Sequence, residues 1–243
     1  MRALLVVGLA NLVACSGTAS SSDAGSGGGG GAGGGDGGAI GGGTGGGATD
    51  GDGGAAFDPC PALPAAPAGA VTVSTTSALL SALQGAAPGA TILLEDGTYS
   101  FSSGQYVYVG ARGVTLRGKS GDATKVVLDG NYNTGFGQSL VTLAADDVTL
   151  ADVTVQRAYD HPIHVQPAFS SPEPLTGVRI YRVRVIDPGQ QAIKVNPDEP
   201  TFTNTLDDGL IACSTIVLTS AGRGQVRDNC YTGGIDIHAG AAG

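Results

Sequence analysis

The stretch "DDVTLADVTVQRAYDHPIHVQ", residues 146–166, decides the fold because it returns thirty positions later as "TGVRIYRVRVIDPGQQAIKVN", residues 176–196. The two copies superpose without a gap, and their apolar residues fall in the same places. The matched pairs are Val148 with Val178, Leu150 with Ile180, Val153 with Val183, Val155 with Val185, Ile163 with Ile193 and Val165 with Val195. A repeat of this length indicates a fold built from stacked copies of one unit.

Each copy contains three short alternating segments, "VTL", "VTV" and "IHV" in the first and "VRI", "VRV" and "IKV" in the second. Alternation of apolar and polar residues predicts strands with one face turned inward. Strands this short are not stable alone, so each must stack on the equivalent strand of the next copy. Residues 113–131 and 214–240 supply an earlier and a later layer, in which Ile235 and Ile237 take the places of Ile193 and Val195.

The predicted fold is therefore all-β, a parallel β-helix over residues 57–243. A β-sandwich is the alternative, but it needs longer strands and does not explain the thirty-residue superposition. Because the chain stops at "GGIDIHAGAAG", directly after a strand, we expect a shortened sequence that lacks further layers.

A helix is expected just before the first layer, within residues 74–101. Ser74, Thr75 or Thr76 can cap it. Its apolar stripe consists of Leu79, Leu80 and Leu83. Such a helix would cover the open end of the solenoid, which otherwise exposes its core and a strand edge.

The passage "PGATILLEDGTY" (88–99), followed by "GVTLRG" (113–118) and "VVLDGN" (126–131), resembles the right-handed parallel β-helix superfamily of the pectin lyase type. Its chondroitinase B and alginate lyase branch begins with a similar passage. The resemblance covers roughly residues 70–243. It implies a right-handed coil and a polysaccharide as the substrate class.

The N-terminus resembles a bacterial lipoprotein signal. Residues 1–15, "MRALLVVGLANLVAC", carry one basic residue, an apolar run and a Leu-Val-Ala-Cys sequence, which implies lipidation of Cys15. Residues 16–56 consist almost entirely of Gly, Ala, Ser, Thr and Asp, so we expect a disordered tether. We therefore expect an exported protein anchored in the bacterial cell envelope, with the outer membrane favoured because Ser16 follows the cysteine.

The charge balance bears on the class of binding partner, and the cysteine content bears on disulfide pairing. Residues 57–243 hold 11 Lys and Arg against 17 Asp and Glu, a balance of −6 without basic runs, which argues against nucleic acid. We expect a monomer. Beyond Cys15 three cysteines remain, and we expect a disulfide between Cys213 and Cys230, with Cys60 lacking a partner in this chain.

The middle residues of the third segments predict a binding face. His164, Lys194 and Asp236 should point outward from three stacked strands about 4.8 Å apart. Thr154, Arg184 and Arg227 are expected to form a second outward column. Loops 166–177 and 196–209 leave the same corner of the repeat and would wall a groove centred on His164, Lys194 and Arg184. An ordinary solvated face is the alternative.

Three functional classes stay open: a non-catalytic glycan-binding β-helix, a polysaccharide lyase acting on uronic-acid polymers, and a structural or adhesion protein. Elimination needs a base and a positive charge beside the substrate carboxylate, so Lys194 would be the base and Arg184 or Arg227 the neutralising group. A glycoside hydrolase is less favoured, because no spacing guarantees the required carboxylate pair.

Further residues are candidates for binding. Tyr159, Tyr181 and Tyr231 lie near turns and could stack on sugar rings. Asp207 and Asp208 could bind Ca²⁺, although "LDDG" is more typical of a turn. Ca²⁺ is the one cofactor that these residues suggest. His161 and His164, with His238, suggest a metal site, but their turn and strand positions favour a structural role.

Overall fold

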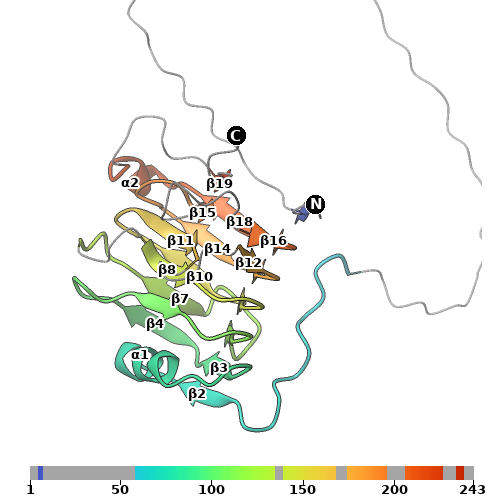
Figure 1. The fold of residues 1–243 in the computed structure, drawn as a ribbon. Helices are drawn as coiled ribbons and strands as arrows, with labels where there is room; N and C mark the ends of the chain where they lie inside the picture. Colours follow the sequence, from blue (N-terminus) through green and yellow to red (C-terminus); the bar gives the residue numbers. More distant parts are fainter. Residues whose placement is uncertain are drawn as a thin grey trace, which may run out of the picture. The chain divides into compact units, whose positions relative to one another are not determined.

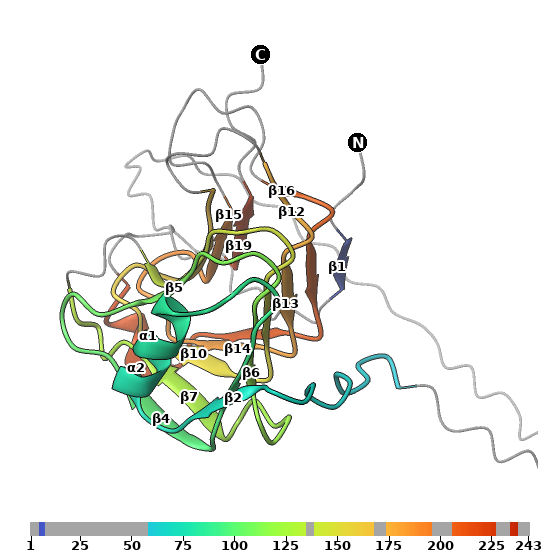
Figure 2. The same cartoon turned by 60° about the horizontal axis from the view of Figure 1, so that its bottom comes forward.

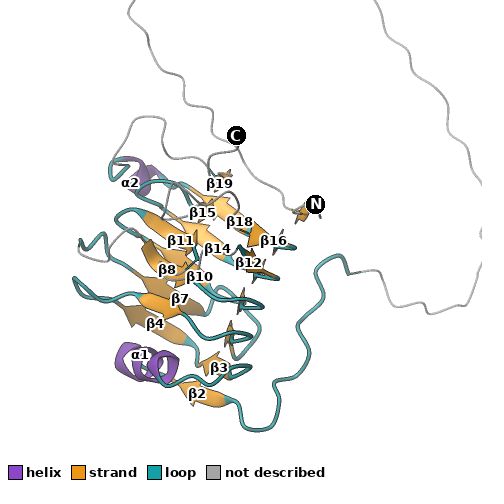
Figure 3. Cartoon of the chain, viewed as in Figure 1, coloured by secondary structure: helices purple, strands orange, loops and turns teal. Residues whose placement is uncertain are grey.

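The computed structural model describes residues 5–7, 58–134, 139–167, 174–195, 206–226 and 234–237, and these are almost entirely short strands (Figure 3). The predicted tether 16–56, Cys15, Arg227, Cys230, Tyr231 and His238 lie outside them. The helices are α1 (Thr76–Gln84) and α2 (Ser220–Arg223). The strands are β1 (Leu5–Val7), β2 (Val71–Val73), β3 (Thr91–Leu94), β4 (Gly97–Ser100), β5 (Val107–Val109), β6 (Thr115–Gly118), β7 (Val126–Asp129), β8 (Ser139–Leu143), β9 (Thr149–Ala151), β10 (Thr154–Gln156), β11 (His161–Val165), β12 (Leu175–Thr176), β13 (Arg179–Tyr181), β14 (Arg184–Ile186), β15 (Ile193–Val195), β16 (Leu206–Asp207), β17 (Leu210–Ala212), β18 (Thr215–Val217) and β19 (Ile235–Ile237).

Three parallel sheets form the walls of a solenoid-like stack (Figure 1). Sheet A has the order β1-β17-β13-β9-β6-β3-β2, sheet B the order β18-β14-β10-β7-β4, and sheet C the order β19-β15-β11-β8-β5. A two-stranded sheet, β12-β16, accompanies them. Figure 2 shows β13 with β6, β10 with β14, and β15 with β19 on three different sides. Each coil thus contributes one strand to each wall.

The register confirms the thirty-residue repeat. Leu150 lies beside Ile180 in sheet A, Val155 beside Val185 in sheet B, and Ile163 beside Ile193 in sheet C. The later layer is confirmed as well, since Ile193 pairs with Ile235 and Val195 with Ile237. Within residues 146–196, residues thirty apart are therefore neighbours one coil apart.

Inward-facing aliphatic side chains from all three walls fill the stack. The repeat residues Val153, Val155, Val183, Val185 and Ile163 are completely buried. Burying one such side chain contributes about 1.5–3 kcal/mol relative to leaving it in water. The repeated Val and Ile positions therefore supply the main driving force for stacking.

The corners depend on residues with positive φ. Asp152, Arg182 and Cys213 occupy equivalent places between sheets A and B, with φ of 54°, 55° and 54°. Asp147 and Asp208 occupy the corner before sheet A, with φ of 56° and 51°. Left-handed backbone is sparsely populated by non-glycine residues, so the stack holds these positions in place.

Helix α1 lies against the first coil, at the β2 end of the stack (Figure 1). Of the three capping candidates, Thr75 is the N-cap: its hydroxyl accepts a hydrogen bond from the Ala78 N–H at 3.1 Å. Leu79 is completely buried, and Leu80 and Leu83 pack partly buried against the core. The predicted apolar stripe is confirmed.

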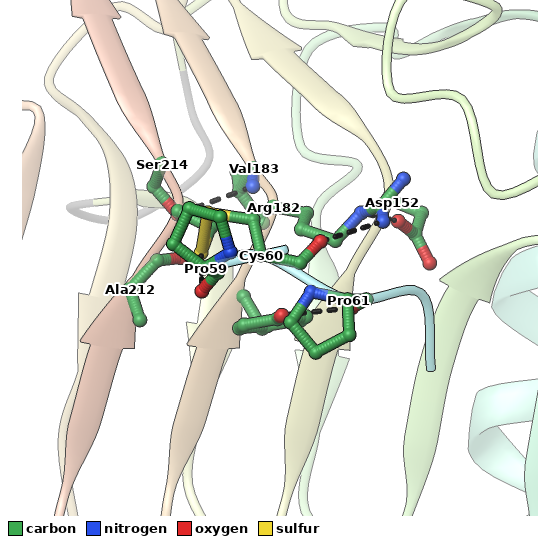
Figure 4. The surroundings of a disulfide bond; sticks show 10 residues. Pro59, Cys60, Pro61, Asp152, Arg182, Val183, Ala212 and Ser214 are labelled. Atoms are coloured by element: carbon green, nitrogen blue, oxygen red, sulfur yellow. Dashed lines mark hydrogen bonds and ion pairs between the residues drawn. A yellow bond between two sulfur atoms is a disulfide. The ribbon is translucent and has the colours of Figure 1, made fainter. Parts of the chain in front are cut away.

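The disulfide joins Cys60 to Cys213, so the predicted pairing of Cys213 with Cys230 is wrong (Figure 4). Residues around Cys60 precede the first coil in sequence but run along the corner of late coils. The Tyr181 hydroxyl donates to the Pro61 carbonyl at 2.8 Å, and Arg182 donates to the Cys60 carbonyl at 3.2 Å. The partner of Cys213 is therefore 153 residues away, a separation at which sequence proximity gives no guidance.

Replacing both Cys60 and Cys213 by Ser should lower the free energy of unfolding by about 2–5 kcal/mol, because the crosslink closes a long loop in the unfolded chain. Denaturant unfolding monitored by circular dichroism measures the change. Cys230→Ser is the matched control and should keep the disulfide and the stability. Loss of stability in Cys230→Ser, with none in the double variant, would contradict the assignment.

Candidate functional site

The predicted outward column exists and is longer than the sequence analysis proposed. The register of sheet C places Tyr108, Thr142, His164, Lys194 and Asp236 side by side on five successive strands, β5, β8, β11, β15 and β19. The residues on either side of the first four enter the core, whereas Asp236, on the last strand, lies between half-buried Ile235 and exposed Ile237. Alternation along the strands turns these five side chains, which we name the sheet C row, to the opposite face from the core.

Burial changes along the sheet C row. Tyr108 is 42% exposed, Thr142 is 9% exposed and His164 is completely buried, whereas Lys194 and Asp236 are half-buried. A completely buried histidine contradicts the alternative of an ordinary solvated face at this position. The row is therefore covered in its middle and accessible toward both ends.

Two imidazoles and two hydroxyls lie together at the buried middle of the sheet C row. The rings of His161 and His164 lie edge to face, with centroids 5.7 Å apart and an interplanar angle of 68°. On the neighbouring strand, the hydroxyls of Ser139 and Thr142 are 2.6 Å apart and share a hydrogen bond. Buried polar groups normally pair in this way, so the cluster is ordered before any ligand arrives.

The charge state of His161 follows from its surroundings. Its pKa is lowered from 6.5 to about 3, chiefly by burial and also by the positive charge of Lys194 and the neighbouring His164. A hydrogen bond to the Gln191 backbone and the Asp236 carboxylate act in the opposite direction and raise the pKa. His161 is therefore neutral at neutral pH. Its Nδ1 has no hydrogen-bond partner among the described residues.

Lys194 and Arg184 do not share a groove, so the predicted site centred on both residues is wrong. Arg184 stacks between Thr154 and Thr215 on sheet B, which is a different wall from sheet C. It faces a hollow of about 540 Å³ beside Asp122 and the disulfide. Thr215, rather than Arg227, follows Arg184 in that column.

The remaining candidates lie apart from the sheet C row. The Tyr181 hydroxyl, on sheet A, is used by Pro61, and Tyr159 lies half-buried in the corner between sheets B and C. Asp207 lies on β16, and Asp208 occupies a left-handed corner position, as a turn residue would. Among the residues that the structure describes, no three His, Cys, Asp or Glu side chains are grouped to hold a metal ion.

The sequence analysis missed four residues near this row. Ser139 and Thr142 belong to "SLVTL", whose alternation predicts only a strand. Tyr106 and Tyr108 belong to "YVYV", in which the aromatic residues alternate with buried valines and so must face outward. That alternation was the available signal for an exposed aromatic pair.

No known family model and no curated protein sequence matches this chain. Within the described part of the chain, no helix has the length and apolar character needed to cross a membrane. The site must therefore be interpreted from its own geometry.

Acidification should destabilise the fold through His161. Its pKa is about 3 in the folded protein and near 6.5 when unfolded, so between these values only the unfolded chain binds the proton. The free energy of unfolding should then fall as pH drops from 6.5 to 3, by up to about 1.4 kcal/mol per pH unit from this group.

The measurement is denaturant unfolding at several pH values for the wild type and His161→Gln. The variant should show a shallower loss of stability across this window, whereas other titrating groups contribute equally to both proteins. Equal slopes would show that His161 is not held neutral by the fold.

Proposed function

We propose that this protein binds an acidic extracellular polysaccharide at the end of the sheet C row that carries Lys194. The observation that carries the proposal is the register, which places half-buried Lys194 between His164 and Asp236 on neighbouring strands. A cation held between ordered strands offers a charge-assisted hydrogen bond to a uronate carboxylate, worth about 1.5–3 kcal/mol.

We also propose the finer architecture and location. Parallel strands joined by crossovers in one sheet are right-handed in nearly all proteins, which supports a right-handed β-helix of the pectin lyase type. The buried Leu79 supports a capping role for α1. Lipidation of Cys15 and the Gly-rich segment 16–56 would anchor and space this domain at the cell envelope, where extracellular polysaccharides occur.

A polysaccharide lyase is the second candidate, favoured by the two imidazoles close to Lys194. In elimination, a base removes the proton α to the carboxylate, a double bond forms between the α and β carbons, and the glycosidic C–O bond at the β carbon breaks as the departing oxygen takes up a proton. A base works best when its pKa lies near the working pH. With a pKa of about 3, His161 is a weak base, and Arg184 is on another wall, so binding is better supported than cleavage.

Lys194→Gln should weaken binding of polygalacturonate by about tenfold, which corresponds to about 1.4 kcal/mol. Binding of the full chain is measured by calorimetry at low and moderate salt, because screening should weaken the wild-type interaction. Lys125→Gln is the matched control: Lys125 is an exposed lysine 4.0 Å from Asp122 and directly precedes β7, a strand of sheet B. Equal affinities for both variants would show that Lys194 does not take part in binding.

The two candidates separate in one further assay. Incubation with polygalacturonate, alginate or chondroitin sulfate followed at about 235 nm detects the unsaturated uronate that elimination produces. We expect binding without a rise in absorbance. A sustained rise that Lys194→Gln abolishes would replace the binding proposal with the lyase.

A further inference from the structure

A second hollow, of about 710 Å³, lies between α1 and β5 at the opposite end of the sheet C row from Lys194. Figure 2 shows α1 beside β5. Tyr106 and Tyr108 form one side, and the polar groups of Gln84, Gln105, Ser77 and Ser81 surround the opening. We name it the tyrosine hollow. None of its lining residues is charged, although the chain carries a net charge of −9.

The two tyrosines are exposed although aromatic side chains gain the most from burial. Tyr106 is 40% and Tyr108 is 42% exposed. Their rings meet edge to face, with centroids 6.3 Å apart and an interplanar angle of 81°. The pair therefore presents one ring face and one ring edge at right angles, which is a concave aromatic corner rather than a flat apolar patch.

The Tyr108 ring packs against position 110, where glycine leaves the space that a side chain would otherwise fill. A Cβ added to Gly110 would lie 2.4 Å from Cε1 of the Tyr108 ring and 3.3 Å from Cζ. The ring thus rests directly on the Gly110 backbone, and partial burial, with a smaller effect of Tyr106, raises the pKa of the Tyr108 phenol. A platform fixed in this way loses little conformational entropy when a ligand stacks on it.

The rim offers donors in a fixed orientation. The Gln105 side-chain oxygen accepts a hydrogen bond from the Ser102 N–H at 2.9 Å, and the amide NH₂ donates to no residue that the structure describes. Gln84 and Ser81 lie on the last turns of α1, a helix whose position is set by the buried Leu79. Hydroxyl and amide groups around an aromatic corner match a ligand that is apolar on one face and rich in hydroxyls at its edge.

We infer that the tyrosine hollow binds a neutral sugar ring, with its C–H face against Tyr108 and its hydroxyls bonded to the Gln105 and Gln84 amides. This site goes beyond the proposed acidic-polysaccharide function and does not depend on it. Tyr108 and Lys194 lie three strands apart in sheet C, which corresponds to about 14 Å, and the buried Thr142 and His164 separate them.

The test uses the full chain and three neutral oligosaccharides: cellotriose, maltotriose and chitotriose. The chain has seven tyrosines and no tryptophan, so tyrosine fluorescence reports on the rings directly. At least one trisaccharide should bind with a change in this fluorescence. Tyr106→Ala and Tyr108→Ala should each weaken it by at least fivefold, whereas Tyr108→Phe should retain most of the affinity because the ring face remains.

Gly110→Ala is the sharper variant, because it leaves both tyrosines in the chain and displaces only the Tyr108 ring. It should weaken trisaccharide binding as much as Tyr108→Ala does, with an unchanged circular dichroism spectrum. Lys194→Gln is the cross-control: it should leave trisaccharide binding intact, as Tyr108→Ala should leave polygalacturonate binding intact. The experiments can therefore reject either proposed binding site without rejecting the other.

Three outcomes would overturn the inference. One is that none of the three trisaccharides binds at 10 mM, a concentration far above the dissociation constant expected for a functional sugar site. Another is full retention of binding in both alanine variants. The third is a concentration-dependent dimer in sedimentation that Tyr106→Ala dissociates, which would assign the hollow to a second copy of this chain.

Discussion

Backbone hydrogen bonding between successive coils is the constraint on which the rest of this structure depends. The bonds continue through the corners, where Arg182 N–H donates to Ala212 O at 3.1 Å and Arg157 N–H to Ile186 O at 3.0 Å. Each residue is thereby fixed beside its equivalent in the next coil. A polar residue that the core excludes in one coil therefore meets the excluded residue of its neighbours, and a row such as that on sheet C follows from the stacking itself.

This constraint explains which features the sequence could predict. Register depends on which side chains enter the core, and the alternating Val and Ile residues indicate which these are. The stacking of His164, Lys194 and Asp236 was therefore predictable from the sequence. The wall on which a strand lies depends instead on corner geometry. Corner residues such as Arg182 and Cys213, between sheets A and B, carry no recognisable signal for positive φ, unlike Gly177 at the corner before sheet A, and the separation of Arg184 from Lys194 was therefore missed.

The disulfide was missed for a related reason. Nearness in sequence suggested Cys230, but in a stack the outer corner of one coil is open to any segment that runs along it. The segment at Cys60 does so, held by Tyr181, Arg182 and Cys213 from two successive coils. Arg182 also pairs with the buried Asp152 at 2.8 Å and donates to the Gly121 carbonyl at 2.7 Å. One arginine thus connects three coils to the segment that precedes them all.

The same stacking rule separates the two surfaces that we assign to ligands. Along the sheet C row, exposed Tyr108 and half-buried Lys194 are divided by Thr142 and His164, which are buried and tied to Ser139 and His161. A charged ligand placed over the tyrosine hollow would find no counter-charge in its lining, whereas a neutral ring placed at Lys194 would partly desolvate the cation without offering it a new charged partner, which is costly. The chemistry at each end therefore selects a different group, even though both ends belong to one uninterrupted row.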